Sequence, residues 1–120
     1  MSRSTILLKL ACTTILLCIA LAIPVTKATV SCSYIKDNIG PCLEYLESGQ
    51  RLSSGCCPYI RKVNSMGVTK ADRKSVCECM KSAVIADPGI LGLYALALPG
   101  KCGVPNFVIP RAFTDCSKIN

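Results

Sequence analysis

The sequence predicts a small all-α domain, a four-helix bundle held together by disulfide bonds and followed by an irregular tail. Three observations predict it. Eight of the ten cysteines lie within residues 29–120. Four segments of that region carry apolar residues at helical spacing, and the last segment has no regular period. The chain shows no internal repeat and no linker, so we expect a single domain over residues 29–120.

The first 28 residues have the features of a secretory signal peptide. Arg3 and Lys9 give it a basic start, an apolar stretch runs over residues 10–23, and Ala28 is a small residue at which a signal peptidase can cut. A membrane anchor is the alternative, but the apolar stretch is short for a membrane span. We therefore predict that residues 1–28 are removed and that residues 29–120 are secreted.

The cysteines that remain predict a disulfide framework. Zinc binding is the alternative, but the chain has no histidine, and residues 29–120 contain no C-x-x-C pair. Short secreted chains that are rich in cysteine are usually linked by disulfides. Cys56 and Cys57 are adjacent, and Cys77 and Cys79 point to opposite sides of a helix, so neither pair bonds easily to itself. Spacing alone leaves many pairings open.

The charge of the predicted domain is modest. Without Arg3, Lys9 and Lys27, 11 basic residues face 7 acidic ones, a net charge of +4. This charge favours weak attraction to anionic membrane surfaces. The lysines are scattered and aromatic residues are few, so we expect no nucleic acid partner.

Residues 33–48 form the first predicted helix. Gly40–Pro41 interrupts the run, so we expect a kink or a loosened turn there. Ser48–Gly49 is expected to end the helix. The apolar stripe consists of Ile35, Ile39, Cys42, Leu43 and Leu46.

The second and third predicted helices carry local start signals. A serine of Ser53–Ser54–Gly55 is the expected N-cap of the second, and residues 65–67 close it. Thr69 and Asp72 match a capping box at the start of the third, which ends at residues 87–89. The expected inward residues are Cys57, Ile60, Val63, Val76, Cys77, Met80 and Val84.

The fourth predicted helix, residues 90–98, is apolar on nearly every side. Such a helix is buried or contacts another apolar surface. Pro99–Gly100 is expected to stop it. Residues 103–120 contain two prolines and no clear period, so we expect an extended tail that is pinned by Cys102 and Cys116 and crosses the helices.

Catalytic chemistry is difficult to assemble from these residues. Without histidine, and with its thiols in disulfides, the domain has no Ser-His or Cys-His nucleophile. Glu44 and Glu47 are neighbours on one helix face, which is typical of a solvated charged face. We therefore predict that the protein is not an enzyme and needs neither a cofactor nor a metal.

The apolar composition leaves two interpretations of the core. The chain has many aliphatic residues, no tryptophan, four tyrosines and two phenylalanines. Aliphatic walls with covalent links permit a dry, hollow core that accepts apolar guests. The alternative, which composition alone favours, is an ordinary packed core.

Arg73 is the charged residue that the pattern singles out. It stands in the first turn of the third predicted helix, where a cation is unfavourable. It is a candidate for contact with an anionic or polar group at the mouth of a cavity. The alternative is a surface pair with Asp72 or Asp87, or simple solvation.

The cysteine spacing from Cys32 to Cys116 reads C-x9-C-x13-CC-x19-C-x-C-x22-C-x13-C. This pattern resembles that of the plant non-specific lipid transfer proteins of type 1 and spans nearly the whole predicted domain. Residues 69–73 are similar to the family's first pentapeptide, T-x-x-D-R. Residues 98–104 and 114–118 also resemble family segments.

The resemblance implies a right-handed bundle of four helices around an internal hydrophobic tunnel, with the tail as one wall. It places Arg73 at the position that contacts lipid head groups, and the polar Glu78 favours the type 1 pairing. The implied disulfides are Cys32–Cys79, Cys42–Cys56, Cys57–Cys102 and Cys77–Cys116. The implied lipid-binding residues in the tunnel lining are Ile35, Ile39, Leu43, Leu46, Ile60, Val63, Val76, Met80, Ala83 and Ala95.

The family's second pentapeptide, P-Y-x-I-S, is not kept. Counted from Cys102, residues 107–111 occupy its place, and Val108 stands where the family has the tyrosine that helps to hold the lipid head group. Phe107 supplies no hydroxyl, and Arg111 is a candidate to compensate. Asp87 and Asn106 are polar at positions that are usually apolar in the family.

The resemblance implies a secreted, extracellular monomer of the plant cell wall or apoplast. Its expected partners are fatty acids, lysolipids or phospholipids, bound with low head-group selectivity. The alternative is a membrane-active antimicrobial defence peptide of the same fold, favoured by the +4 charge and the apolar fourth helix. A third possibility is a protease or amylase inhibitor, but the best candidate for its binding loop, residues 48–55, shows no inhibitory feature.

Overall fold

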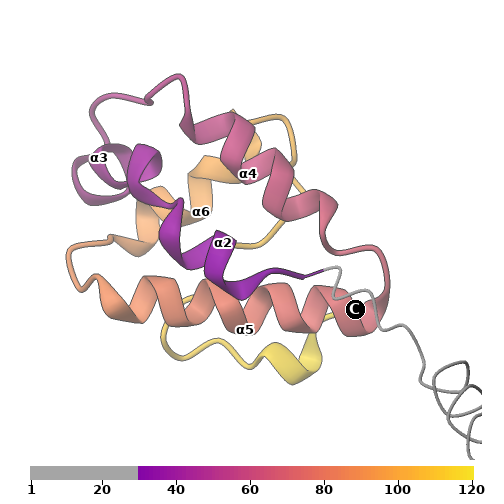
Figure 1. Cartoon of the computed structure of the whole chain (residues 1–120). Coiled ribbons are helices and arrows are strands. Elements are labelled where there is room, and N and C mark those ends of the chain that lie inside the picture. Colours follow the sequence, from indigo (N-terminus) through magenta and orange to yellow (C-terminus); the bar gives the residue numbers. More distant parts are fainter. Residues whose placement is uncertain (1–29) are drawn as a thin grey trace, which may run out of the picture.

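The computed structural model describes residues 30–120, so the predicted signal peptide lies outside the described residues. This part of the chain contains five α-helices, one short 3₁₀ helix and no strand. The α-helices are α2 (Cys32–Asp37), α3 (Gly40–Ser48), α4 (Cys56–Ser65), α5 (Lys70–Ala86) and α6 (Gly92–Lys101), and the 3₁₀ helix is η1 (Cys116–Lys118). Figure 1 shows α5 along one side of the molecule, with the last segment of the tail below it. The prediction of an all-α fold is confirmed.

The first predicted helix is divided into two helices, α2 and α3. Asn38 ends α2, where its backbone N–H and its side-chain amide both donate to the carbonyl of Tyr34, at 3.1 and 2.9 Å. Helix α3 restarts at Gly40, which places Pro41 in its first turn. The backbone N–H that proline lacks is not needed at that position. The interruption expected at Gly40–Pro41 is therefore a complete break just before it.

The start of α4 differs from the prediction. Gly55 is the N-cap and makes no side-chain capping bond, so the expected serine cap is wrong. Ser53 instead accepts the N–H of Cys56 with its backbone carbonyl, at 3.0 Å, in the turn that leads into the helix. This turn places both serines before the cap position.

The start of α5 is a capping box, as predicted. The hydroxyl of Thr69 accepts the N–H of Asp72 at 3.1 Å, and the carboxylate of Asp72 accepts the N–H of Thr69 at 3.1 Å. Both bonds satisfy donors that the first turn of a helix leaves without a partner in the helix. The longest helix therefore has a defined beginning.

Helix α6 continues through Pro99 and Gly100 to Lys101, so the predicted stop at Pro99 is wrong. Pro99 lies in the last turn of the helix, where it disturbs a single helical hydrogen bond, its own to the carbonyl of Ala95. The carbonyls there find other donors. Leu98 accepts the N–H of Cys102 at 3.1 Å, and Pro99 accepts the N–H of Val104 at 2.9 Å.

Four disulfides frame this part of the chain. They are Cys32–Cys79, Cys42–Cys56, Cys57–Cys102 and Cys77–Cys116, the pairs that the resemblance implies. The first joins α2 to α5 and the second joins α3 to α4. The third joins α4 to the end of α6, and the fourth holds η1 against α5. Every α-helix is thus tied to another element.

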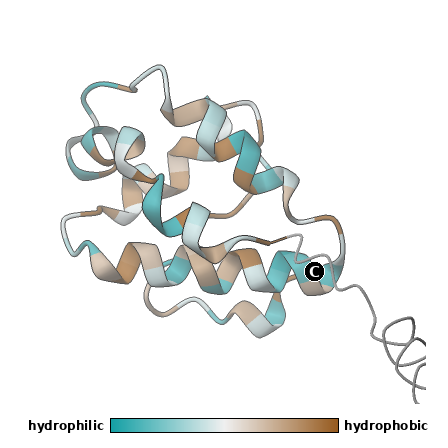
Figure 2. Cartoon of the chain, viewed as in Figure 1, coloured by the Kyte–Doolittle hydropathy of each residue, from teal (hydrophilic) through white to brown (hydrophobic). Residues whose placement is uncertain are grey.

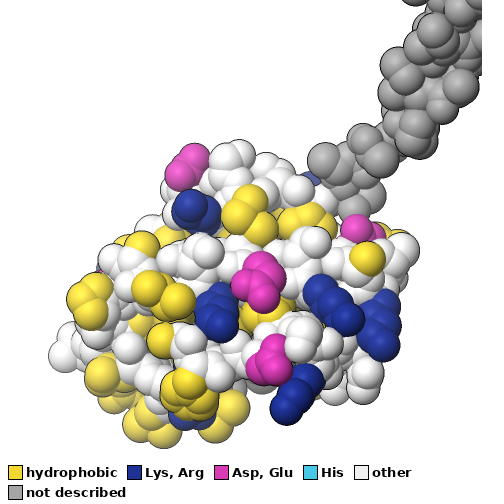
Figure 3. All heavy atoms as spheres, turned by 90° about the horizontal axis from the view of Figure 1, so that it is seen from below, with side chains coloured by type: hydrophobic (Ala, Val, Ile, Leu, Met, Phe, Trp, Pro, Cys, Tyr) yellow, Lys and Arg dark blue, Asp and Glu magenta, His cyan; other side chains and the backbone are white. Residues whose placement is uncertain are grey.

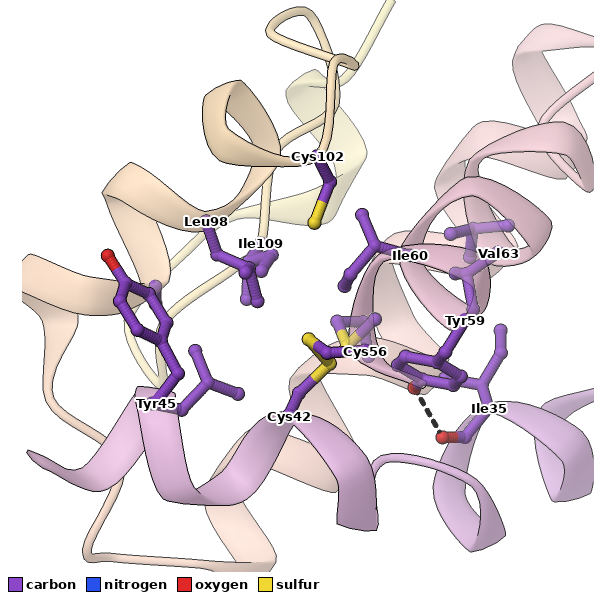
Figure 4. Close-up of a cluster of buried hydrophobic side chains, with 14 of the residues drawn as sticks. Ile35, Cys42, Tyr45, Cys56, Tyr59, Ile60, Val63, Leu98, Cys102 and Ile109 are labelled. Carbon is purple, nitrogen blue, oxygen red and sulfur yellow. Dashed lines mark hydrogen bonds between the residues drawn. A yellow bond between two sulfur atoms is a disulfide. The ribbon is translucent and has the colours of Figure 1, made fainter. Parts of the chain in front are cut away.

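The buried side chains of the core come from all five α-helices and the tail, and Figure 4 shows those of α2, α3, α4, α6 and the tail. Two tyrosines, Tyr45 and Tyr59, lie among them. The hydroxyl of Tyr59 donates to the carbonyl of Ile35 at 2.6 Å, which links α4 to α2. Burial and the neighbouring Tyr34 raise the pKa of Tyr59 well above its usual value of 10.0, so this bond persists in alkaline solution.

Figure 2 shows hydrophobic and hydrophilic residues sharing the same helices, as amphipathic packing requires.

The tail crosses α5 and is held to it at three levels. The ammonium of Lys81 donates to the carbonyl of Thr114 at 2.7 Å. Cys77 is bonded to Cys116. Near the start of α5, the Nε of Arg73 donates to the backbone oxygen of Asn120 at 2.6 Å, and Figure 1 places the C-terminus there. The tail is therefore held in a defined position against α5.

Gly49, which caps α3, is a position where any side chain should destabilise the fold. Its φ is +71°, and a Cβ there would overlap the ring of Tyr94. We expect Gly49→Ala to lower the free energy of unfolding by about 2 kcal/mol or more, from the left-handed backbone and the displaced ring together. Urea denaturation measures this change. Gly100→Ala, where a Cβ meets nothing within 4 Å, is the matched control.

Candidate functional site

Two cavities border the inner face of α5, one near each end. The small cavity, about 100 Å³, includes Arg73 and Val76 in its lining. The large cavity, about 340 Å³, includes Val84 in its lining. The helix from Val76 to Val84 covers about 12 Å along its axis. Met80 and Ala83, between these residues in the sequence, are buried.

The small cavity lies between α4, the start of α5 and the tail. Its lining combines apolar side chains with the guanidinium of Arg73 and three asparagines. Of the predicted lipid-binding residues, it contains Arg73, Val76 and Val108. The complete lining is Asn64, Gly67, Arg73, Val76, Cys77, Asn106, Phe107, Val108, Ile119 and Asn120.

Arg73 is held by backbone oxygens. Besides the bond from its Nε to Asn120, its Nη1 donates to the carbonyls of Gly67 and Val68, at 3.4 and 3.2 Å. Its unfavourable position at the start of a helix is thus offset by acceptors from the α4–α5 loop and the end of the tail. Arg73 thus links the α4–α5 loop to the end of the tail, and it also borders the cavity. Contact between Arg73 and a lipid head group stays a prediction.

Val108 is 55% exposed and borders the small cavity without a polar group. Phe107 is half-buried beside it. In place of the tyrosine hydroxyl of the family pattern, this wall offers the side-chain amide of Asn106. The polar groups of the small cavity are therefore the guanidinium and amides.

The large cavity lies between the end of α5, the start of α6 and residues 110–113 of the tail. Its walls are mainly aliphatic, with Asp87 and Arg111 as its charged residues. Of the predicted lipid-binding residues, it contains Ala95. The complete lining is Val84, Ile85, Asp87, Pro88, Ile90, Gly92, Ala95, Pro110, Arg111, Ala112 and Phe113.

Most of the other predicted lining residues belong to the hydrophobic core and border neither cavity. Ile35, Leu46, Ile60, Val63, Met80 and Ala83 are buried, and Ile39 and Leu43 are half-buried. Along α5, Val76, Met80 and Val84 recur every four residues, so one apolar stripe leads from the small cavity to the large one. We call this stripe of Val76, Met80 and Val84 the apolar path.

The sequence did not single out several residues of the large cavity. Ile85 and Phe113 are exposed by 54% and 80%. Ile85 lies outside the inward stripe of α5, and Phe113 belongs to a segment without a period, so hydrophobic periodicity carries no signal for either. Figure 3 shows hydrophobic side chains gathered toward one end of the viewed face.

A pair of carboxyl groups lies beside the large cavity. Glu47, near the end of α3, shares a hydrogen bond with Asp87 after α5, and this bond and the charge of Asp87 raise the pKa of Glu47 above its usual 4.5. Asp87 also accepts the N–H of Gly89 at 3.0 Å. Because the folded state binds this proton more tightly, the pair favours folding at acid pH and opposes it at neutral pH.

We expect Glu47→Gln to change the pH dependence of stability. In the native protein, the free energy of unfolding should fall as the pH rises from 4.5 through the raised pKa of Glu47. The variant should lose this fall and melt at a higher temperature at pH 7. Thermal unfolding between pH 4 and pH 7 tests it, with Glu44→Gln on the same helix as control. A parallel pH dependence in all three proteins would contradict the interaction.

Neither a membrane span nor a metal cluster is found in residues 30–120. None of the described helices is both long and apolar enough to cross a bilayer. Within the same residues, no three His, Cys, Asp or Glu side chains come together as metal ligands.

These features define a small, disulfide-framed helical protein with apolar cavities. Residues 25–116 match the model of the "Protease inhibitor/seed storage/LTP family". The chain belongs to this family. It is 40% identical over 107 residues to the non-specific lipid-transfer protein Lac s 1 of Lactuca sativa, covering 88% of this chain and 90% of that protein.

Two similar proteins have been solved with lipids bound. A wheat non-specific transfer protein complexed with two molecules of phospholipid is 27% identical, with a TM-score of 0.66 over 75% of this chain and all of that chain. Barley non-specific lipid transfer protein 1 in complex with lysophosphatidylcholine is 28% identical, with a TM-score of 0.66 over 76% of this chain and all of that chain. Both share the helical fold described above.

Proposed function

We propose that this protein is a secreted lipid carrier, which binds the acyl chains of fatty acids, lysolipids or phospholipids along the inner face of α5. The observation that carries the proposal is the apolar path from Val76 to Val84, with a cavity at each end. Burying an acyl chain there contributes roughly 0.8 kcal/mol per methylene before ordering costs. With few polar groups along the path, selectivity among head groups is low.

The disulfide framework supports this proposal. A bundle tied by Cys57–Cys102 and Cys77–Cys116 retains its shape without filling every internal space. Apolar cavities remain dry and accept apolar guests. The wheat and barley proteins named above, which bind phospholipid and lysophosphatidylcholine, also support a role in lipid binding. The role requires no catalytic residue.

Displacement of a lipophilic fluorescent probe tests the proposal. The oxidised protein should take up the probe, and oleate and lysophosphatidylcholine should displace it with similar affinities. The reduced protein should take up much less, because its cavities depend on the disulfides. Absence of probe uptake by the oxidised protein would refute the lipid carrier.

A second candidate function is membrane-active defence at anionic surfaces. It is favoured by the net charge of +4 and by Leu93 and Leu96 on the outer side of α6, which are 69% and 71% exposed. Leakage of vesicles rich in phosphatidylglycerol, weakening as salt is added, is the expected result. Vesicles that stay intact at low salt would exclude this activity.

A further inference from the structure

We propose that Arg111 holds the anionic head group of a lipid at the mouth of the large cavity, so that lipids with a carboxylate or phosphate bind more tightly than uncharged lipids of the same chain length. This inference rests on the proposed function and adds to it a preferred class of lipid and a residue that selects it. The sequence suggested Arg111 as a substitute at the position of the lost tyrosine. The structure instead assigns it to the other cavity.

The position of Arg111 is fixed by its surroundings. Its backbone N–H donates to the hydroxyl of Thr114 at 2.8 Å, and its carbonyl accepts the N–H of Thr114 at 3.0 Å. The side chain lies against the start of α6, where a Cβ on Gly92 would be 3.3 Å from Nε. The Cζ of Arg111 lies 5.6 Å from the ring centroid of Phe113. The guanidinium is thus oriented at the cavity wall.

The two arginines of the path differ in their partners. Arg73 donates to three backbone oxygens. For the guanidinium of Arg111, residues 30–120 supply no acceptor within hydrogen-bond distance. An arginine with its donors open to a ligand suits a carboxylate or a phosphate, which it can bind through two parallel bonds. Arg111 is therefore the better candidate for an external anion.

The walls around Arg111 match the rest of such a ligand. Val84, Ile90, Ala95 and Pro110 supply apolar surface inside the cavity. Outside it, Phe113 forms an apolar rim that is 80% exposed. An acyl chain in the cavity would place its head group at this rim.

The acidic residue in the lining has partners of its own. Asp87 accepts the N–H of Gly89 and shares a hydrogen bond with Glu47. Its charge still disfavours an anion nearby, so the preference for anionic lipids should be moderate, about three- to tenfold, as expected for a partly exposed ionic contact.

The test compares three ligands with the same twelve-carbon chain: dodecanoate, dodecyl phosphate and dodecanol. Their affinities for the oxidised protein are measured by calorimetric titration at pH 8 and low salt. The wild type should prefer both anions to dodecanol by about three- to tenfold. In Arg111→Gln this preference should disappear, while the affinity for dodecanol is unchanged. Arg111→Lys should keep part of it.

The control is Arg51→Gln, which removes an exposed arginine from the loop between α3 and α4 and should leave the preference intact. A preference that survives Arg111→Gln, or a wild type without any preference, would overturn the inference and leave the lipid carrier standing. Failure of all three ligands to bind the wild type would instead contradict the proposed function itself.

Discussion

Replacing Cys57 and Cys102 by serine should lower the free energy of unfolding by about 4 kcal/mol. This disulfide joins residues 45 positions apart and links α4 to the end of α6. Without it, the unfolded chain regains the freedom of a long loop, and α4 loses its covalent link to the end of α6. For a domain of this size the melting temperature should fall by roughly 20 °C. Denaturation by urea and by heat measures both quantities.

The disulfide Cys42–Cys56 supplies the control. It closes a shorter segment, with a sequence separation of 14, so its replacement by two serines should cost about 3 kcal/mol. The test depends on which replacement lowers the free energy of unfolding more, and less on the size of either change. A larger loss for the short loop than for the long one would contradict the account of these bonds as restraints on the unfolded chain.

Ala95→Leu should weaken lipid binding without weakening the fold. Ala95 is 1% exposed and lines the large cavity. A leucine there would occupy the room of two or three methylenes of the ligand. At ~0.8 kcal/mol each, the loss is about 2 kcal/mol, or roughly thirtyfold in affinity. Titration with a long-chain fatty acid measures the affinity, and urea denaturation measures the stability.

Ala97→Leu is the matched control, because Ala97 lies on the exposed side of the same helix. It should leave the affinity unchanged. If Ala95→Leu destabilises the protein by several kcal/mol instead, the space beside Ala95 is already filled. If both variants bind fatty acid like the wild type, acyl chains do not enter the large cavity.

Local signals predicted the parts of the fold that depend on neighbours in the sequence. The capping box of Thr69 and Asp72 is one example, because its bonds span only three residues. The continuation of α6 past Pro99 was missed, because a proline after an apolar run usually marks the end of a helix. The pairing of the cysteines came from the resemblance to a known family, since spacing alone left it open.

The candidate site was predictable where it follows a helical stripe. Val76 and Met80 recur at helical spacing, and the structure buries both. The tail has no period, so the sequence carried no sign that Arg111 and Phe113 border the cavity at the end of α5. The bond from Arg73 to Asn120 was equally hidden, because Asn120 lies 47 residues away in the sequence.

The central claim is that an acyl chain lies along the inner face of α5. Nuclear magnetic resonance of the oxidised protein with lysophosphatidylcholine tests it most directly, through nuclear Overhauser effects between the acyl methylenes and protein methyl groups. We expect contacts to Val76, Met80 and Val84, on the stripe that joins the two cavities. Contacts confined to the exposed Leu93 and Leu96 would place the lipid on the outer surface and contradict the claim.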